Sequence, residues 1–83
     1  MLIHTPKDLA LMVIDQRKKL KLSQSQVGAL VGVKQTTISA FENKPENTKL
    51  ETLFNILSAV NLEINLSGKD KSLTTETPWK EEW

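Results

Sequence analysis

The chain has 83 residues, with 11 Lys and Arg against 10 Asp and Glu, a net charge of +1, and no cysteine. A chain of this length forms one domain with a small core, so oligomerisation is a ready source of further stability. The lack of cysteine excludes disulfides, iron–sulfur clusters and thiolate zinc sites, and it is compatible with a reducing cytosol. No apolar run is long enough to span a membrane, so we expect a soluble, cytoplasmic protein.

The first predicted helix covers residues 6–20. Thr5 is its expected N-cap, Pro6 stands in the first turn where a missing N–H costs nothing, and Asp8 lies at the third helical position. The residues expected to face the core are Leu9, Met12, Val13, Gln16 and Leu20. Four cations lie near the end of this helix: Arg17, Lys18, Lys19 and Lys21. The helix macrodipole favours cations there, and so would a nearby polyanion, and the sequence leaves both explanations open.

Two short helices are predicted at 24–31 and 35–43, separated by a turn at Gly32-Val33. Ser23 and Gln26 have the spacing of a capping box, which marks the start of the first of the two. The residues expected on its inward side are Val27, Leu30 and Val31. A glycine is common just past the end of a helix, so Gly32 indicates where this helix ends and the turn begins.

In the second short helix, Ile38 and Phe41 are three positions apart, so we expect both to face the core. Its outward side carries Gln35, Thr36 and Ser39. Small polar side chains and an amide can reach base edges in a major groove, whereas a merely solvated face more often carries Glu and Lys. The two helices together therefore predict a helix-turn-helix that reads DNA.

A further helix is predicted at 49–60, opened by a capping box of Thr48 and Glu51. Its apolar residues are Leu50, Leu53, Phe54, Ile56, Leu57 and Val60. The loop at 43–47 that precedes it has room for a turn of one more helix.

Residues Leu62 to Leu66 alternate strictly between apolar and polar side chains, which is the pattern of a half-buried strand. A single strand needs a partner, and the nearest partner is the same strand of a second copy across a twofold axis. The fold class is thus all-α, a small helix bundle with one C-terminal strand that pairs across a dimer through Leu62, Ile64 and Leu66. The alternative is a segment that packs Leu62 and Ile64 onto its own helices.

From Ser67 the composition becomes polar, so we expect a domain at 1–66 and a flexible tail at 67–83. Both tryptophans of the chain, Trp79 and Trp83, fall in this tail. Exposed indoles in a polar segment suggest a peptide that docks onto a partner. The alternative is that both fold back onto the domain.

Several residues of the central segment resemble the Cro/phage-repressor (XRE) type of helix-turn-helix: Gln24, Gly28, Gly32-Val33, Ile38-Ser39 and Glu42. The resemblance covers about residues 5–61. The chain departs from that family at Gly28, where alanine is usual, and at Lys34, where a capping serine or threonine is common. Lys34 gives up a cap and brings a cation to the expected DNA surface.

The resemblance implies which residues contact DNA. The expected base contacts are Lys34, Gln35, Thr36, Ser39 and Ala40. The expected phosphate contacts are Gln24, Ser25, Lys34, Thr37 and Asn43. Gln35 is the leading base contact because its amide can bond both N6 and N7 of adenine, the alternative being a solvated glutamine. Arg17 and Glu42 occupy positions where the family has an ion pair, which we expect to be structural.

No residues carry an enzyme site. His4 has no second histidine or carboxylate at ligand spacing, and the serines have no base to activate them. We therefore expect no catalysis, no metal, no cofactor and no small-molecule ligand.

The segment Lys34–Asn43 and the terminal Glu82-Trp83 resemble the HipB-type antitoxins more narrowly. That resemblance implies a homodimer that represses its own operon at a palindromic operator and neutralises a HipA-type serine/threonine kinase toxin. The alternatives are a free-standing phage-type repressor and a protein adaptor that does not bind DNA.

Overall fold

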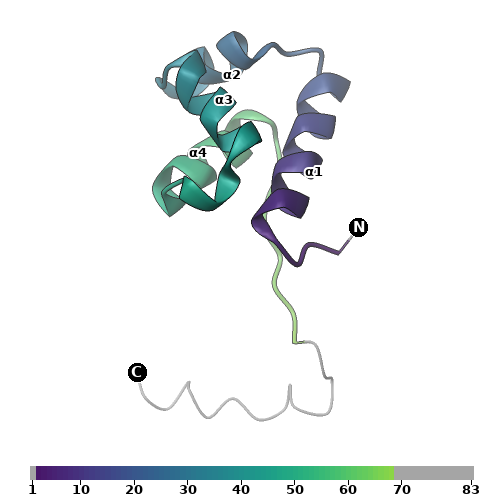
Figure 1. Ribbon diagram of the computed structural model, residues 1–83. Helices are drawn as coiled ribbons and strands as arrows, with labels where there is room; N and C mark the ends of the chain where they lie inside the picture. The colour runs from purple at the N-terminus through teal and green to yellow at the C-terminus, as the bar shows by residue number, and fades with distance from the viewer. Residues whose placement is uncertain (1, 69–83) are drawn as a thin grey trace, which may run out of the picture.

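The computed structural model describes residues 2–68. Within that part, four α-helices and one short 3-10 turn pack into a bundle (Figure 1). In chain order the elements are α1 (Pro6–Lys19), α2 (Gln24–Val31), α3 (Gln35–Asn43), η1 (Pro45–Asn47) and α4 (Leu50–Ala59). The predicted all-α bundle is confirmed, and the helices begin and end within one residue of the expected positions. Trp79 and Trp83, with the docking role predicted for them, lie outside the described residues.

Hydrogen bonds at both ends of α1 pair backbone groups that the helix itself leaves without partners. At its start the Thr5 hydroxyl accepts a hydrogen bond from the Asp8 N–H at 3.0 Å, as predicted. At its end the Lys21 N–H donates to the Lys18 carbonyl at 2.9 Å, and the Leu22 N–H donates to the Arg17 carbonyl at 3.1 Å. These two bonds form a Schellman motif, which places Lys21 in the left-handed region at φ 60°.

Helix α2 is bounded by the predicted signals. The Ser23 hydroxyl accepts from the Gln26 N–H at 3.0 Å, and the Gln26 side chain accepts from the Ser23 N–H at 2.8 Å, so the capping box is confirmed. Gly32 ends the helix at φ 73°. Gly28 allows the following turn to pack against the helix, because a Cβ there would lie 2.5 Å from the Val33 carbonyl oxygen. The departure from alanine at this position thus has a steric cause.

The start of α4 differs from the prediction. Its N-cap is Lys49, which makes no side-chain capping bond, so the expected Thr48 and Glu51 capping box is wrong. Thr48 belongs to the preceding turn, because its N–H donates to the Pro45 carbonyl at 3.1 Å and closes η1. The 3-10 turn itself falls in the loop where room for a further helical turn was expected.

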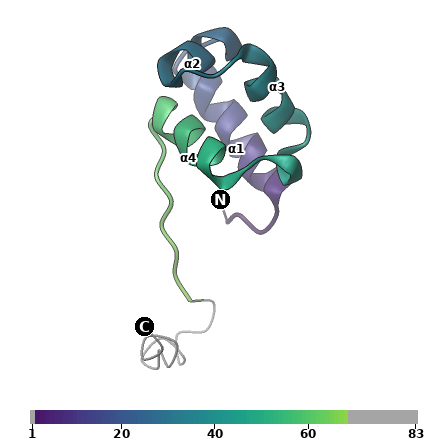
Figure 2. The ribbon, with the colours of Figure 1, turned by 90° about the vertical axis from the view of Figure 1, so that its left-hand side faces the viewer.

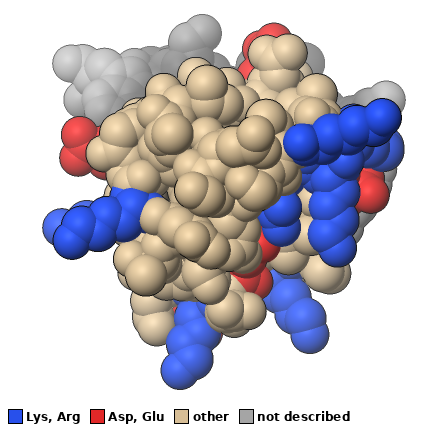
Figure 3. Space-filling model, turned by 90° about the horizontal axis from the view of Figure 1, so that it is seen from above, with Lys and Arg blue, Asp and Glu red and all other residues tan. Residues whose placement is uncertain are grey.

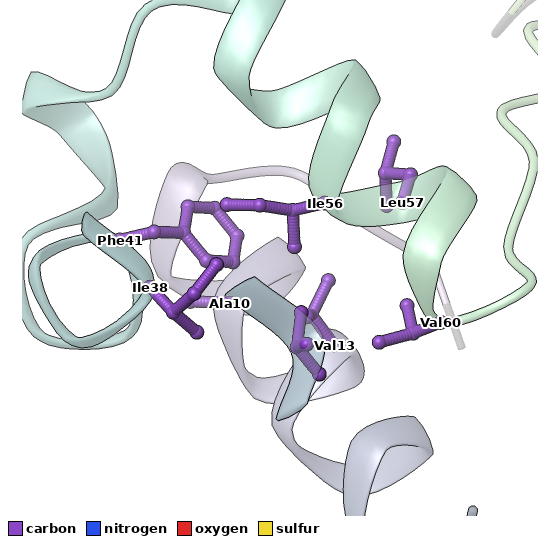
Figure 4. Packing of buried hydrophobic residues seen from close by; sticks show 8 residues of the cluster. Ala10, Val13, Ile38, Phe41, Ile56, Leu57 and Val60 are labelled. Carbon is purple, nitrogen blue, oxygen red and sulfur yellow. The ribbon is translucent and has the colours of Figure 1, made fainter. Parts of the chain in front are cut away.

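The core lies where α1, α2, α3 and α4 meet (Figure 4). Its buried residues are Ala10, Val13, Val27, Ile38, Phe41, Ile56, Leu57 and Val60. The Gln16 side chain faces inward as expected and donates to the Val60 carbonyl at 3.1 Å, which ties α1 to the end of α4. Among the α-helices, the packing contacts run mainly between α2 and α3, between α2 and α4, and between α1 and α3.

Two leucines predicted to face inward are exposed, and a smaller residue takes part in the core instead. Leu20 lies beyond the last turn of α1 and is 41% exposed, while Leu30 is 61% exposed. Leu30 follows the buried Gly28 by two positions, about 200° around the helix, so it points away from the core. Ala10, which the sequence did not indicate as a core residue, is 2% exposed and belongs to the core.

Residues 62–68 form no regular element and run away from the bundle beyond α4 (Figure 2). Leu62 packs against the core, as the alternative reading of this segment expected, whereas Leu66 is 91% exposed. Ile64 lines a groove together with Phe54 and Leu57 of α4. Pairing of this segment with a second copy of the chain stays a prediction.

Candidate nucleic-acid interface

Helix α3 presents most of its predicted DNA-contacting residues to solvent. Lys34, Gln35, Thr36 and Ala40 are exposed, and Thr37 and Ser39 are half-buried. Because Ile38 and Phe41 are buried on the opposite side, the orientation of the helix is fixed by the core. The side of α3 that faces the core is therefore the one that the sequence predicts, and the polar side faces outward.

The start of α3 has no side-chain cap. Lys34 is the N-cap, its side chain makes no capping bond, and its carbonyl accepts from the Thr37 N–H at 3.0 Å. A helix start without a side-chain cap leaves backbone N–H groups available to an anion, and the helix dipole favours negative charge at that end. The loss of a cap at Lys34 is thus compatible with a phosphate nearby.

A bidentate ion pair links α1 to the end of α3. The Arg17 Nε donates to Glu42 Oε2 at 2.7 Å, and Arg17 Nη2 donates to Glu42 Oε1 at 3.0 Å. The two side chains are only 12% and 6% exposed. Arg17 Nη1 also donates to the Leu22 carbonyl at 3.0 Å, so one guanidinium joins α1, the turn before α2, and α3. Planar guanidinium groups suit such multiple bonding.

Gln24 connects that ion pair to the leading base contact. Its amide nitrogen donates to Glu42 Oε1 at 2.9 Å, and its amide oxygen accepts from Gln35 Nε2 at 3.4 Å. The sequence predicts a phosphate contact for Gln24 and does not indicate these two hydrogen bonds. No local signal could have revealed them, because the partners lie 18 and 11 positions away.

The hydrogen-bond inventory of Gln35 remains sufficient for reading adenine. One of its two amide hydrogens is used by Gln24, which leaves the other hydrogen and the carbonyl oxygen. A bidentate contact needs one donor to N7 and one acceptor from N6. The bond to Gln24 therefore leaves Gln35 with both kinds of hydrogen-bonding group that this contact uses.

Ser39 and Asn43 lie four positions apart and contact each other on the surface of α3. The Asn43 side-chain nitrogen donates to the Ser39 hydroxyl at 3.3 Å. Residues at this spacing share one side of a helix. The base contact expected of Ser39 and the phosphate contact expected of Asn43 would thus arise from adjacent points on one surface.

Lys and Arg side chains form no single continuous patch on the face seen from above (Figure 3). Seen from above, one group of Lys and Arg side chains stands on the side where α1 ends, and others stand apart (Figure 3). Among residues 2–68 there is no group of acidic, histidine and cysteine side chains that could hold a metal ion. No helix in the same range is long and apolar enough to cross a membrane.

Comparison with known proteins decides the family. Residues 13–66 match the model of the helix-turn-helix family. The antitoxin HipB of Escherichia coli strain K12 is 37% identical over 82 residues, which cover 98% of this chain and 93% of that protein. The HipB antitoxin of Escherichia coli O6:H1 is 41% identical over 64 residues, or 77% of this chain and 68% of that protein. The chain belongs to the HipB antitoxin family.

Solved structures of HipB share the described bundle. A HipB complex with an O4 20-mer has a TM-score of 0.80 and 37% sequence identity, covering 84% of this chain and 99% of the HipB chain. A HipA–HipB–O2–O3 complex contains a chain with a TM-score of 0.81 and the same identity, with 84% and 99% covered. The predicted helix-turn-helix bundle of the HipB type is thereby confirmed.

Proposed function

We propose that this protein is a transcriptional autorepressor and an antitoxin that binds its operator as a dimer and neutralises a HipA-type serine/threonine kinase toxin. Family membership supports the proposal, because HipB relatives were solved with 20-mers, which we take as operator DNA, and with HipA. The protein works by binding, without catalysis of its own, in the cytoplasm and on the nucleoid when it occupies its operator.

The observation that carries the DNA-binding part is the outward polar side of α3, held in place by the largely buried side chains of Arg17 and Glu42 and by Gln24. Gln35 would read an adenine, and Thr36, Ser39 and Ala40 would contact neighbouring base edges. Phosphates on either side would be bound by side chains that position the helix without specifying sequence. These are Gln24, Ser25, Lys34, Thr37 and Asn43.

Dimerisation is supported by apolar side chains that one chain leaves uncovered. Leu50 and Phe54 of α4 are 70% and 55% exposed, and Ile64 and Leu66 of the following segment are exposed as well. Phe54 and Ile64 line one groove, and apolar exposure of this kind on a small domain marks an interface. A second copy would cover α4 and pair its residues Leu62–Leu66 with those of the first, which gives the unpaired segment a hydrogen-bonding partner.

A twofold dimer dictates the form of the operator. The two recognition helices would enter successive major grooves on one side of the duplex, with half-sites about 34 Å or a multiple apart. The operator is therefore expected to be palindromic. A protein adaptor that had lost DNA binding would not require this symmetry.

Binding of the toxin is assigned to the tail, and above all to Trp83, with Trp79 as a second anchor. Tryptophan is among the commonest anchors of protein interfaces, and a polar segment that orders on binding can place such an anchor in a partner's pocket. The folded domain would then bind DNA while the tail binds the kinase.

The experiment uses the full chain and two ligands. Mobility shift with the DNA upstream of its own gene tests the repressor, and calorimetry with the kinase encoded beside that gene tests the antitoxin. Removing Ser67–Trp83 should leave operator binding nearly intact and weaken kinase binding, with Trp83→Ala reproducing much of that loss. A chain that binds neither ligand would refute the proposal, and one that binds only DNA would be a free-standing repressor.

A further inference from the structure

Three residues of the described chain have a positive φ, and each follows the end of a helix: Lys21 at 60°, Gly32 at 73° and Asn61 at 64°. Glycine reaches this left-handed region without steric cost, and asparagine tolerates it better than other residues do. A lysine Cβ lies too close to the following carbonyl oxygen there. Helix α1 thus ends on the least suitable residue of the three.

The surrounding contacts fix this backbone turn. Two Schellman bonds join it to the last turn of α1, and Arg17 Nη1 holds the Leu22 carbonyl from outside at 3.0 Å. Leu22 is packed against the core. A strained conformation persists where its surroundings determine it to this degree, and such strain gathers at functional positions. These contacts explain the backbone conformation at Lys21, but they do not explain why the residue there is a lysine.

Lys21 is exposed and stands close to the proposed DNA surface. It precedes Gln24 by three positions, so their Cα atoms are at most about 11 Å apart. Gln24 in turn contacts Gln35 of the recognition helix. Exposed cations gather where α1 ends (Figure 3), and one of them, Lys19, pairs with Asp15 at 3.3 Å. A lysine at position 21 adds a charge at the edge of this surface next to α2.

We infer that Lys21 contacts a DNA phosphate, and that a lysine stands at this strained backbone position because of its charge. This inference rests on the proposed operator binding and extends its phosphate surface beyond α2 and α3 to the end of α1. Contact with a phosphate releases a condensed counterion, so the contribution of Lys21 is greatest at low salt and independent of the base sequence.

Two substitutions separate the charge from the backbone. Lys21→Gly removes both the charge and the strain, and Lys21→Gln removes the charge alone. Lys7→Gln is the matched control, because Lys7 is an exposed lysine in the first turn of α1, at the opposite end of that helix. All three chains are melted by circular dichroism and titrated by fluorescence anisotropy on upstream DNA at several salt concentrations.

Lys21→Gly should raise the melting temperature and weaken DNA binding. A residue with a purely structural role would not change stability and binding in opposite directions. Loss of one contact per protomer makes the slope of log K against log salt less steep by about 1.8 for a dimer. Wild type then loses about 12-fold more affinity than the variant between 50 and 200 mM salt. Lys21→Gln should match this change of slope with little change in melting temperature.

The inference is overturned if the slope stays at the wild-type value, if Lys7→Gln changes it equally, or if only the glycine variant binds less well. In those cases wild-type binding to upstream DNA would remain and the proposed function would survive. Failure of the wild-type chain to bind that DNA at any salt concentration would instead overturn both.

Discussion

Replacing Glu42 with alanine should strand a nearly buried charge. The Glu42 carboxylate accepts three hydrogen bonds, from Arg17 Nε at 2.7 Å, Arg17 Nη2 at 3.0 Å and Gln24 Nε2 at 2.9 Å. Only 12% of the Arg17 side chain is exposed, so water cannot replace the lost carboxylate well. The energetic consequence is set by the guanidinium that is left behind more than by the pair that is lost.

Removal of one partner from a buried ion pair destabilises a protein by about 3–5 kcal/mol. Arg17 retains its bond to the Leu22 carbonyl, so the lower end of about 3 kcal/mol is the expected loss for Glu42→Ala. A domain of this size has a total stability of about 4–12 kcal/mol. At about 4–8 °C per kcal/mol, the melting temperature should fall by about 12–24 °C.

Thermal and urea unfolding of Glu42→Ala, Arg17→Met and the double variant measures the coupling. The double variant should be less destabilised than the sum of the single variants, because methionine leaves no charge to strand. Lys19→Ala is a control that breaks the exposed pair with Asp15 and should hardly change the melting temperature. Single effects that add to within about 0.5 kcal/mol would refute the reasoning.

Three other substitutions test the remaining features. Gln35→Ala should weaken operator binding by about 1–3 kcal/mol and relax the choice at one base pair, and unchanged specificity in a mobility shift would rule out the assignment. Gly28→Ala should destabilise the fold by about 1–2 kcal/mol in urea, because the clash with the Val33 carbonyl oxygen outweighs the gain in helix propensity. Ile64→Pro should weaken the dimer by removing a ladder donor, and light scattering that finds wild type monomeric at micromolar concentration would contradict the interface.

Local signals explain what the sequence could predict. The Ser23 capping box and Gly32 each act on the adjacent end of α2 alone, so the sequence predicts both boundaries correctly. The capping box expected at Thr48 failed because η1 uses the Thr48 N–H first, which residue spacing alone does not reveal. Leu30 was misplaced because Gly28, with no side chain to count as apolar, sets which side of α2 is buried.

The contacts of Gln24 belong to the non-local kind, and they change how the ion pair relates to DNA. Without the Glu42 carboxylate, the Gln24 amide loses its acceptor and is free to rotate away from Gln35. The Gln35 amide would then have to be ordered on the DNA itself, which lowers affinity through lost side-chain entropy. Glu42→Ala should therefore bind the operator more weakly even at temperatures where it is fully folded. A purely structural pair would weaken binding only in proportion to the unfolded fraction, so affinity measured well below the melting temperature distinguishes the two roles.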